Sequence, residues 1–236
     1  MTAIPFRHWA LGLTAALSLA SPTVAQAEAA IALTTSTGST LIVASSVMKS
    51  IPAAKDEGWL AYDLAVDQVM LADPQGKRVI KGSFAAYCQA IHTLLTGAVK
   101  AVPPPRPLVV VTPVGDGGKI AGVATAKYRV EVNGRPYQEV WVAVSMPASV
   151  ALASWASVKL ATCSSLGGSE AAPELDPRYR AMAERGLIVQ TVSSTGGKGE
   201  IRDTITDIRD STLSPADLSP PAAWPVVSFD DFVNGR

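Results

Sequence analysis

Short apolar runs separated by tight turns dominate the first part of the chain. Residues 40–43, 60–63, 68–71 and 78–80 are rich in aliphatic and β-branched side chains, as strands are. Residues 73–76 read Asp-Pro-Gln-Gly, a turn signal because proline presets φ and glycine allows a positive φ. The last three runs therefore predict an antiparallel meander.

After Ser83 the apolar residues follow the three-and-four spacing of an amphipathic helix. They are Phe84, Tyr87, Cys88, Ile91, Leu94, Leu95 and Ala98. Ser83 is a suitable N-cap, so we expect a helix that lies against the sheet and ends near Gly97. Residues 101–107 are proline-rich and predict a stiff, extended connector.

The clearest hairpin lies in the second half. Residues 128–132 and 137–144 flank Asn133-Gly134, the dipeptide preferred in two-residue type I′ turns. A loop of this length pairs Val132 with Arg135 and Val130 with Tyr137. The alternation of strand side chains then predicts one shared, mainly apolar face made of Tyr128, Val130, Val132, Tyr137 and Trp141.

Two helices and further strands are expected around this hairpin. A strand at residues 108–111 leads into glycine-rich residues 115–119, which we interpret as a hairpin turn. The pattern predicts a helix from Pro147 to about Thr162, whose small residues allow close packing on a sheet, and a second helix at 177–185 with Asp176 as its cap.

Strands are also predicted at residues 187–193 and 200–208, joined by a glycine-rich turn at 196–199. From about residue 212 the chain contains several prolines, and we expect an extended tail over the surface.

The amino terminus has the pattern of a secretory signal peptide. Arg7 provides the positive charge, residues 9–19 form an apolar run too short to span a bilayer, and Ala25-Gln26-Ala27 matches the signal peptidase motif. We therefore predict that residues 1–27 are removed before Glu28, although a second match would cut before Ala30. No cysteine lies there to carry a lipid anchor, so the mature chain should be periplasmic or secreted.

Residues 28–236 are expected to form a single domain. Hydrophobic residues make up 48% of the chain, enough for a substantial core. Removal of Arg7 takes one of 20 basic residues and none of the 20 acidic ones, so the mature chain is close to neutral. This balance argues against a nucleic-acid partner.

Cys88 and Cys163 both belong to the mature chain. Two thiols in an oxidising compartment often form a disulfide, but each also lies in an apolar helical stretch where a free cysteine could be buried. Their spacing excludes a CxxC redox motif and a zinc knuckle, and leaves both alternatives open.

Several short motifs, in conserved order along the chain, resemble a family of uncharacterised secreted bacterial domains. They lie at residues 62–64 and 73–74, 119–122 and 127–128, 139–142, 185–189, 204–208 and 218–224. The resemblance covers roughly residues 40–227. One departure is Ala124-Thr125-Ala126, where many members have a cysteine, so the disulfide pattern of the family does not carry over.

That family is similar in architecture to the outer-membrane lipoprotein carriers. The resemblance implies an α+β fold in which an incomplete antiparallel β-barrel, a curled sheet, packs on two or three helices with a hydrophobic cavity between them. It implies no catalytic residues.

The residues themselves also give little sign of catalysis. His92 is the one histidine of the mature chain, and no GxSxG motif accompanies it. The glycine clusters lack the phosphate-binding spacing. Asp203, Asp207 and Asp210 lack a calcium-binding pattern and are interpreted as a solvated strand face. We therefore expect no catalytic residue, no metal and no cofactor.

Large apolar side chains are the remaining candidates for function. They are Trp59, Phe84, Tyr128, Val130, Tyr137, Trp141 and Trp155. They could fill the core, or they could line a cavity that binds a lipid-like ligand by burial.

The leading hypothesis is a periplasmic, non-enzymatic binding or carrier-like protein for a hydrophobic small molecule, lipid or lipoprotein acyl chain, without a stable membrane span. One alternative is an interaction module that docks on an envelope protein through a sheet edge or the proline-rich tail. Another is a hydrolase that uses His92.

Overall fold

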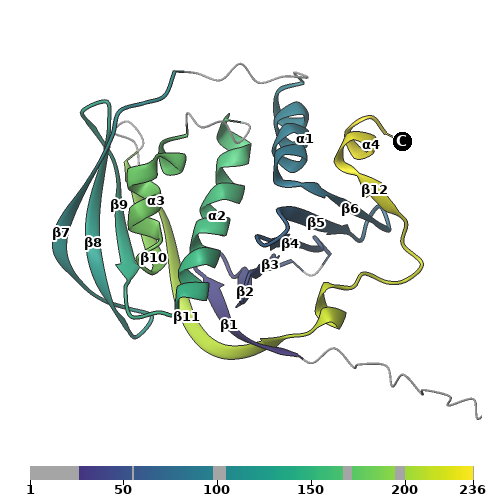
Figure 1. Cartoon of the computed structure of the whole chain (residues 1–236), viewed down its shortest axis with the longest axis horizontal. Coiled ribbons are helices and arrows are strands. Elements are labelled where there is room, and N and C mark those ends of the chain that lie inside the picture. The colour runs from purple at the N-terminus through teal and green to yellow at the C-terminus, as the bar shows by residue number, and fades with distance from the viewer. Residues whose placement is uncertain (1–26, 55, 98–104, 167–171, 195–199, 236) are drawn as a thin grey trace, which may run out of the picture.

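Figure 1 shows the computed structural model, which describes residues 27–54, 56–97, 105–166, 172–194 and 200–235. Residues 1–26 of the expected signal peptide, most of the proline-rich connector and the turn at 196–199 lie outside these residues.

Within them, twelve strands form one sheet, and four α-helices and two 3-10 helices accompany it. The strands are β1 (Glu28–Thr35), β2 (Thr40–Ala44), β3 (Val47–Ile51), β4 (Trp59–Asp63), β5 (Gln68–Asp73), β6 (Arg78–Ser83), β7 (Val109–Ile120), β8 (Val123–Val132), β9 (Arg135–Ala143), β10 (Leu187–Ser194), β11 (Glu200–Leu213) and β12 (Val226–Ser228). The helices are α1 (Phe84–Thr96), α2 (Ala148–Leu166), η1 (Pro173–Leu175), α3 (Pro177–Ala183), η2 (Pro215–Leu218) and α4 (Phe229–Val233).

The strand order is β12-β6-β5-β4-β3-β2-β1-β11-β10-β9-β8-β7, and only β12 and β6 run parallel. The sheet is open, because β12 and β7 lie at its two ends and do not pair. The fold is thus α+β with a large, mostly antiparallel, unclosed sheet. In Figure 1 helix α2 runs between strands β7 to β10 on one side and β2 to β6 on the other.

The predicted meander and first helix are confirmed. Strands β4, β5 and β6 pair in succession, and the side chain of Asp73 accepts a hydrogen bond from the Gly76 N–H at 2.8 Å in the turn. Ser83 caps α1, since its hydroxyl accepts from the Ala86 N–H at 3.2 Å. Gly97 ends the helix with a φ of 69°, a value that glycine adopts at little cost.

The glycine-rich segment at 115–119 is not a hairpin turn, contrary to the prediction. It lies inside β7, where two register shifts accommodate its glycines, and Ala121-Gly122 forms the turn instead. A Cβ on Gly117 would lie 2.6 Å from Cδ1 of Trp141. The glycine is therefore needed for the indole ring to pack across the strand.

The register predicted for the β8–β9 hairpin is correct at the turn and wrong beyond it. Val132 pairs with Arg135, but a β-bulge makes Val130 pair with Gln138 and not with Tyr137. Tyr137 is the extra residue on β9. Beyond the bulge every side chain of β9 exchanges faces, so Trp141 pairs with Lys127 and lies opposite the face of Tyr128 and Val130.

The segment after residue 212 is more regular than the predicted extended tail. Strand β12 adds to β6, and α4 follows it directly. Phe229 of α4 is 2% exposed and meets the ring of Tyr87 edge-on, with 5.5 Å between ring centroids. Lys49 on β3 is buried, and its ammonium donates to the backbone oxygen of Asp217 in η2. An apolar anchor and a buried hydrogen bond thus hold this segment on the sheet.

Helices α1 and α2 are joined covalently. Cys88 and Cys163 form a disulfide with 4.7 Å between their Cα atoms, so the first of the two alternatives holds. Both cysteines are buried, and 75 residues separate them.

Replacing both cysteines by alanine should lower the free energy of unfolding by about 2–4 kcal/mol, because the crosslink closes a long loop in the unfolded chain. Urea titration followed by tryptophan fluorescence measures this change. A reducing agent should destabilise the wild type to a similar degree and leave the double variant unchanged; equal stabilities of the two proteins without reductant would contradict the prediction.

Candidate ligand-binding cavity

A cavity of about 280 Å³ lies between α2 and the face of the sheet that the helix covers. Its wall comes from strands β1, β2, β3, β9, β10 and β11, from α2, and from η1 and α3. Helix α2 contacts β2, β3 and β10, so it forms one side of the cavity along much of its length. The sequence of α2 explains the space, because its alanines and serines leave a gap that larger residues would fill.

One part of the wall is apolar. Strands β1 to β3 contribute Leu33, Leu41, Val43 and Met48. Helix α2 and strands β10 and β11 contribute Val158, Leu187, Ile188 and Ile205. Leu33, Val43, Met48 and Leu187 are each at most 3% exposed, so this part reaches into the main core.

Polar residues gather toward the other end, as the strand register shows. Gln138 pairs with Ser193, and in the next row of the same face Thr191 pairs with Asp203. These four residues line the cavity, as does Glu174 from η1. The cavity is therefore amphipathic, with an apolar part and a polar end, and helix α2 adds Ser154, Ser157 and Thr162 to its wall.

The β-bulge on β9 places Gln138 in this wall. Without the extra residue, Tyr137 would lie opposite Val130 and Gln138 would point to the other face of the sheet. Gln138 is only 7% exposed, and its amide interacts with the hydroxyl of Tyr179, which also lines the cavity. The cavity wall thus contains a buried amide and a buried hydroxyl side by side.

Two tyrosines belong to the polar end: Tyr179 lines the cavity, and Tyr137 contacts the lining residue Glu174. The Tyr137 hydroxyl donates to a carboxylate oxygen of Glu174, and burial followed by this hydrogen bond raises the pKa of Tyr137. Burial also raises the pKa of Tyr179, to which the charge of Glu174 adds, whereas a side-chain hydrogen bond with Gln138 acts in the opposite direction. Both hydroxyls therefore remain protonated at neutral pH.

None of the seven apolar residues singled out from the sequence lines this cavity. Tyr128, Val130 and Trp155 lie in a core cluster between the β7–β9 region and α3, and Tyr137 packs against it. The prediction that Trp141 shares a face with these residues is wrong because of the bulge. The ring of Trp141 instead packs under the ammonium of Lys127, at 4.6 Å.

The remaining two lie elsewhere in the core and on the sheet. Trp59 stacks with the buried ammonium of Lys49 at 4.6 Å, on the side held by the carboxyl-terminal segment. Phe84 stacks on Tyr62 with 5.6 Å between the ring centroids.

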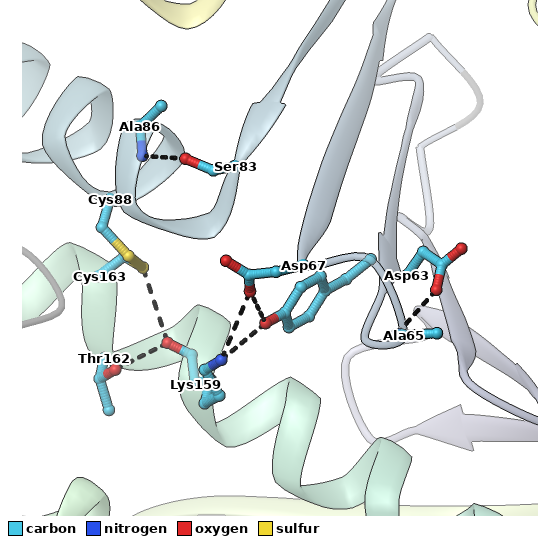
Figure 2. A network of polar contacts seen from close by, with 10 residues as sticks. Asp63, Ala65, Asp67, Ser83, Ala86, Cys88, Lys159, Thr162 and Cys163 are labelled. Carbon is cyan, nitrogen blue, oxygen red and sulfur yellow. Dashed lines mark hydrogen bonds and ion pairs between the residues drawn. A yellow bond between two sulfur atoms is a disulfide. The ribbon is translucent and has the colours of Figure 1, made fainter.

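A second polar cluster lies on the other side of α2 and contains Lys159 and Asp67 (Figure 2). The Lys159 ammonium donates to the Tyr62 hydroxyl at 2.6 Å, and that hydroxyl donates to Asp67 at 2.7 Å. The ammonium also lies 4.2 Å from the centroid of the Phe84 ring. Burial lowers the pKa of Lys159, and the Asp67 carboxylate partly offsets this. The disulfide is one helical turn away (Figure 2), so this cluster and the crosslink fix the same part of α2.

The remaining groups considered in the sequence analysis are His92, possible metal ligands and the three aspartates of β11. His92 lies half-buried on α1 and does not line the cavity. Within the described residues no group of three or more histidine, cysteine, aspartate or glutamate side chains is arranged to hold a metal ion. Asp203, Asp207 and Asp210 are exposed on β11.

Among the described residues, no helix combines the length and apolar character needed to cross a membrane. No protein-family model matches the chain, and no curated protein matches it.

Sequence reasoning missed Gln138, Thr191, Asp203 and Glu174 as a group. The strands of Gln138, Thr191 and Asp203 are correctly predicted, but only the register brings these residues together, and Glu174 lies in η1, which the sequence analysis did not predict. One feature of the sequence could have indicated the site. Gln138 is a polar residue in a strand whose residues otherwise alternate, and the bulge turns it toward the cavity.

The Lys159 cluster gives a second test, a double-mutant cycle with Tyr62→Phe and Lys159→Met. Tyr62→Phe should lower the free energy of unfolding by about 1–3 kcal/mol when Lys159 is present, because the half-buried ammonium loses its acceptor. The same change should lower it clearly less in the Lys159→Met background. Equal costs in both backgrounds would contradict coupling.

The pH dependence of the same proteins has a defined sign. The folded-state pKa of Lys159 is lower than its usual 10.5, so between these values the unfolded state binds more protons. Stability of the wild type relative to Lys159→Met should therefore rise with pH as the pH passes through the folded pKa toward 10.5. Urea titrations at a series of alkaline pH values measure this difference.

Proposed function

We propose that this protein is a periplasmic or secreted carrier-like binding protein that holds one hydrophobic ligand with a polar end in the cavity between α2 and the sheet. The observation that carries the proposal is the cavity itself, about 280 Å³ with an apolar part and a buried amide at its polar end. Burial of an apolar chain supplies affinity without specific chemistry, and a few polar groups fix orientation.

The size of the cavity limits the ligand. Binding sites for small molecules usually have about 300–1,000 Å³, so this cavity is at the lower end of that range. It suits a single short acyl or alkyl chain better than the several chains of a lipoprotein anchor. We therefore propose a single-chain ligand and not a whole lipoprotein.

The proposed architecture follows the resemblance noted in the sequence. The open sheet and the helices that contact its strands would form an incomplete barrel like that of the outer-membrane lipoprotein carriers. Cavities between a curled sheet and its helices suit apolar ligands, which supports a carrier over a catalyst.

The proposal is tested by native mass spectrometry of the protein purified from periplasm, followed by solvent extraction and lipid analysis. We expect a chain that begins at Glu28 or Ala30 and carries a stoichiometric adduct with an alkyl or acyl chain. A ligand-free mass that stays unchanged after incubation with envelope lipids would overturn the carrier function.

A cavity-filling variant ties the adduct to this site. Val158→Phe enlarges a side chain of α2 that lines the cavity, and ligand affinity should fall by about tenfold or more. Val66→Phe makes the same change at a residue that is 66% exposed in the β4–β5 turn, and it should bind ligand as the wild type does. Equal adduct on all three proteins would place the ligand elsewhere.

A second candidate is favoured by the β7 edge of the sheet. This strand is twelve residues long and exposes Val110 and Val114, and Leu108 directly before it is 58% exposed. Unpaired edge strands can add a strand from a partner, as an envelope interaction module would require. A ligand-free mass together with an envelope protein crosslinked to a photoreactive residue at position 110 would favour this function.

A further inference from the structure

The long direction of the cavity runs across the strands. Its lining residues come from six consecutive strands of the sheet, with Gln138 on β9 at one limit and Met48 on β3 at the other. Neighbouring strands are about 4.8 Å apart, so this direction measures roughly 24 Å along the sheet. The lining residues of α2 extend from Ser154 to Thr162, which is only about 12 Å along the helix axis. An extended ligand chain therefore has most room across the strands.

The two limits of this direction differ in polarity. Gln138 and Ser193 line the β9–β10 limit, and Glu174 is held there by the hydroxyl of Tyr137. On β2 and β3 every lining residue is apolar, namely Leu41, Val43 and Met48. Apolar groups gain most from burial where the wall offers no hydrogen bonds, and polar groups lose least where it does. The polar group of a ligand therefore belongs near β9 and its chain points toward β3.

Met48 closes the apolar limit. It is 1% exposed, and it pairs with Val43 on β2 and with Tyr62 on β4. Residues directly opposite each other share a face of the sheet, so the Tyr62 ring lies just beyond Met48. Tyr62 does not line the cavity, is 1% exposed, and is fixed by its hydrogen bonds to Lys159 and Asp67. Met48 is thus the last side chain that a ligand chain can reach.

A methionine at this position is a removable stop. Its side chain is unbranched and fills irregular gaps in a core, whereas the tyrosine behind it is rigid. Truncation of a buried side chain leaves a space, because the surroundings relax only partly. At Met48 that space would be continuous with the cavity, and its apolar lining would accept further carbons of a ligand chain.

We propose that Met48 sets the maximum length of the apolar chain that this protein binds, with the polar group of the ligand at the β9–β10 limit and the chain end against Met48. This inference rests on the proposed carrier function. It makes the protein selective for chain length, since each carbon is buried only as far as the end wall.

Isothermal titration of the delipidated mature protein with 1-alkanols from hexanol to dodecanol tests the inference. Affinity should rise about fourfold for each added CH₂ and stop rising once the chain reaches Met48. In Met48→Ala the longest chain that still gains affinity should be about two to three carbons longer, because the change removes the side chain beyond Cβ.

A matched control is Met70→Ala, the same change on β5. Met70 is half-buried and does not line the cavity, and it follows Val69, which pairs with Tyr62, so its side chain lies on the opposite face of the sheet. Its length limit should equal that of the wild type. A steady rise through the whole series in the wild type, or an unchanged limit in Met48→Ala, would overturn the inference and leave the carrier function standing. Failure of every alkanol to bind, together with a ligand-free native mass, would overturn the carrier function itself.

A photoreactive probe tests the orientation without any substitution. A 1-alkanol at the length limit, with a diazirine at the far end of its chain, is bound to the wild type and irradiated. Peptide mass spectrometry should find the label on Met48 or Val43, which form the apolar limit. Labelling of β9 or β10 would show the reverse orientation and overturn the inference, whether or not Met48→Ala folds.

Discussion

The structure depends on how helix α2 is buried. Its sequence has apolar or small residues on nearly all sides, so no single face can be turned to water while another meets a flat sheet. The sheet meets this constraint by running past the helix on both sides, with β10 on one and β2 and β3 on the other. The disulfide to α1 and the Lys159–Tyr62 contact hold the helix at this depth. Because its residues are small, the enclosed space is not completely filled, and the cavity is the result.

Local signals in the sequence were sufficient for most elements. Asp73-Pro74-Gln75-Gly76 and Asn133-Gly134 predicted two turns correctly, and Ser83 and Asp176 predicted helix caps that the structure contains. These features depend on a few neighbouring residues, whose φ preferences and hydrogen bonds act within one turn of the chain. The antiparallel character of the sheet followed from the same short-range signals.

The candidate site could not be predicted in this way, because it depends on long-range register. A single extra residue, Tyr137, reverses the faces of β9, so Gln138 enters the cavity and Trp141 leaves the predicted face. Of the aromatic residues that composition singled out, Tyr128 and Trp155 are buried in the core, whereas Trp59 and Trp141 pack against lysine side chains. Likewise, the prolines after residue 212 suggested an extended tail. In the structure the side chain of Phe229 is buried in the core, and this segment forms β12 and α4.

The position of β1 has a consequence for how the chain reaches its final state. This strand is the first of the described chain, yet one of its neighbours in the sheet is β11, whose last residue is Leu213. Likewise, β6 gains a partner on its outer side only when β12 has arrived. Both halves can begin as local hairpins, but joining them requires nearly the whole chain, so topology should make the last stage slow. Until then, the edges of β1 and β11 that pair in the final sheet remain exposed. A chaperone that covers exposed strand edges during biogenesis would therefore bind at these two strands.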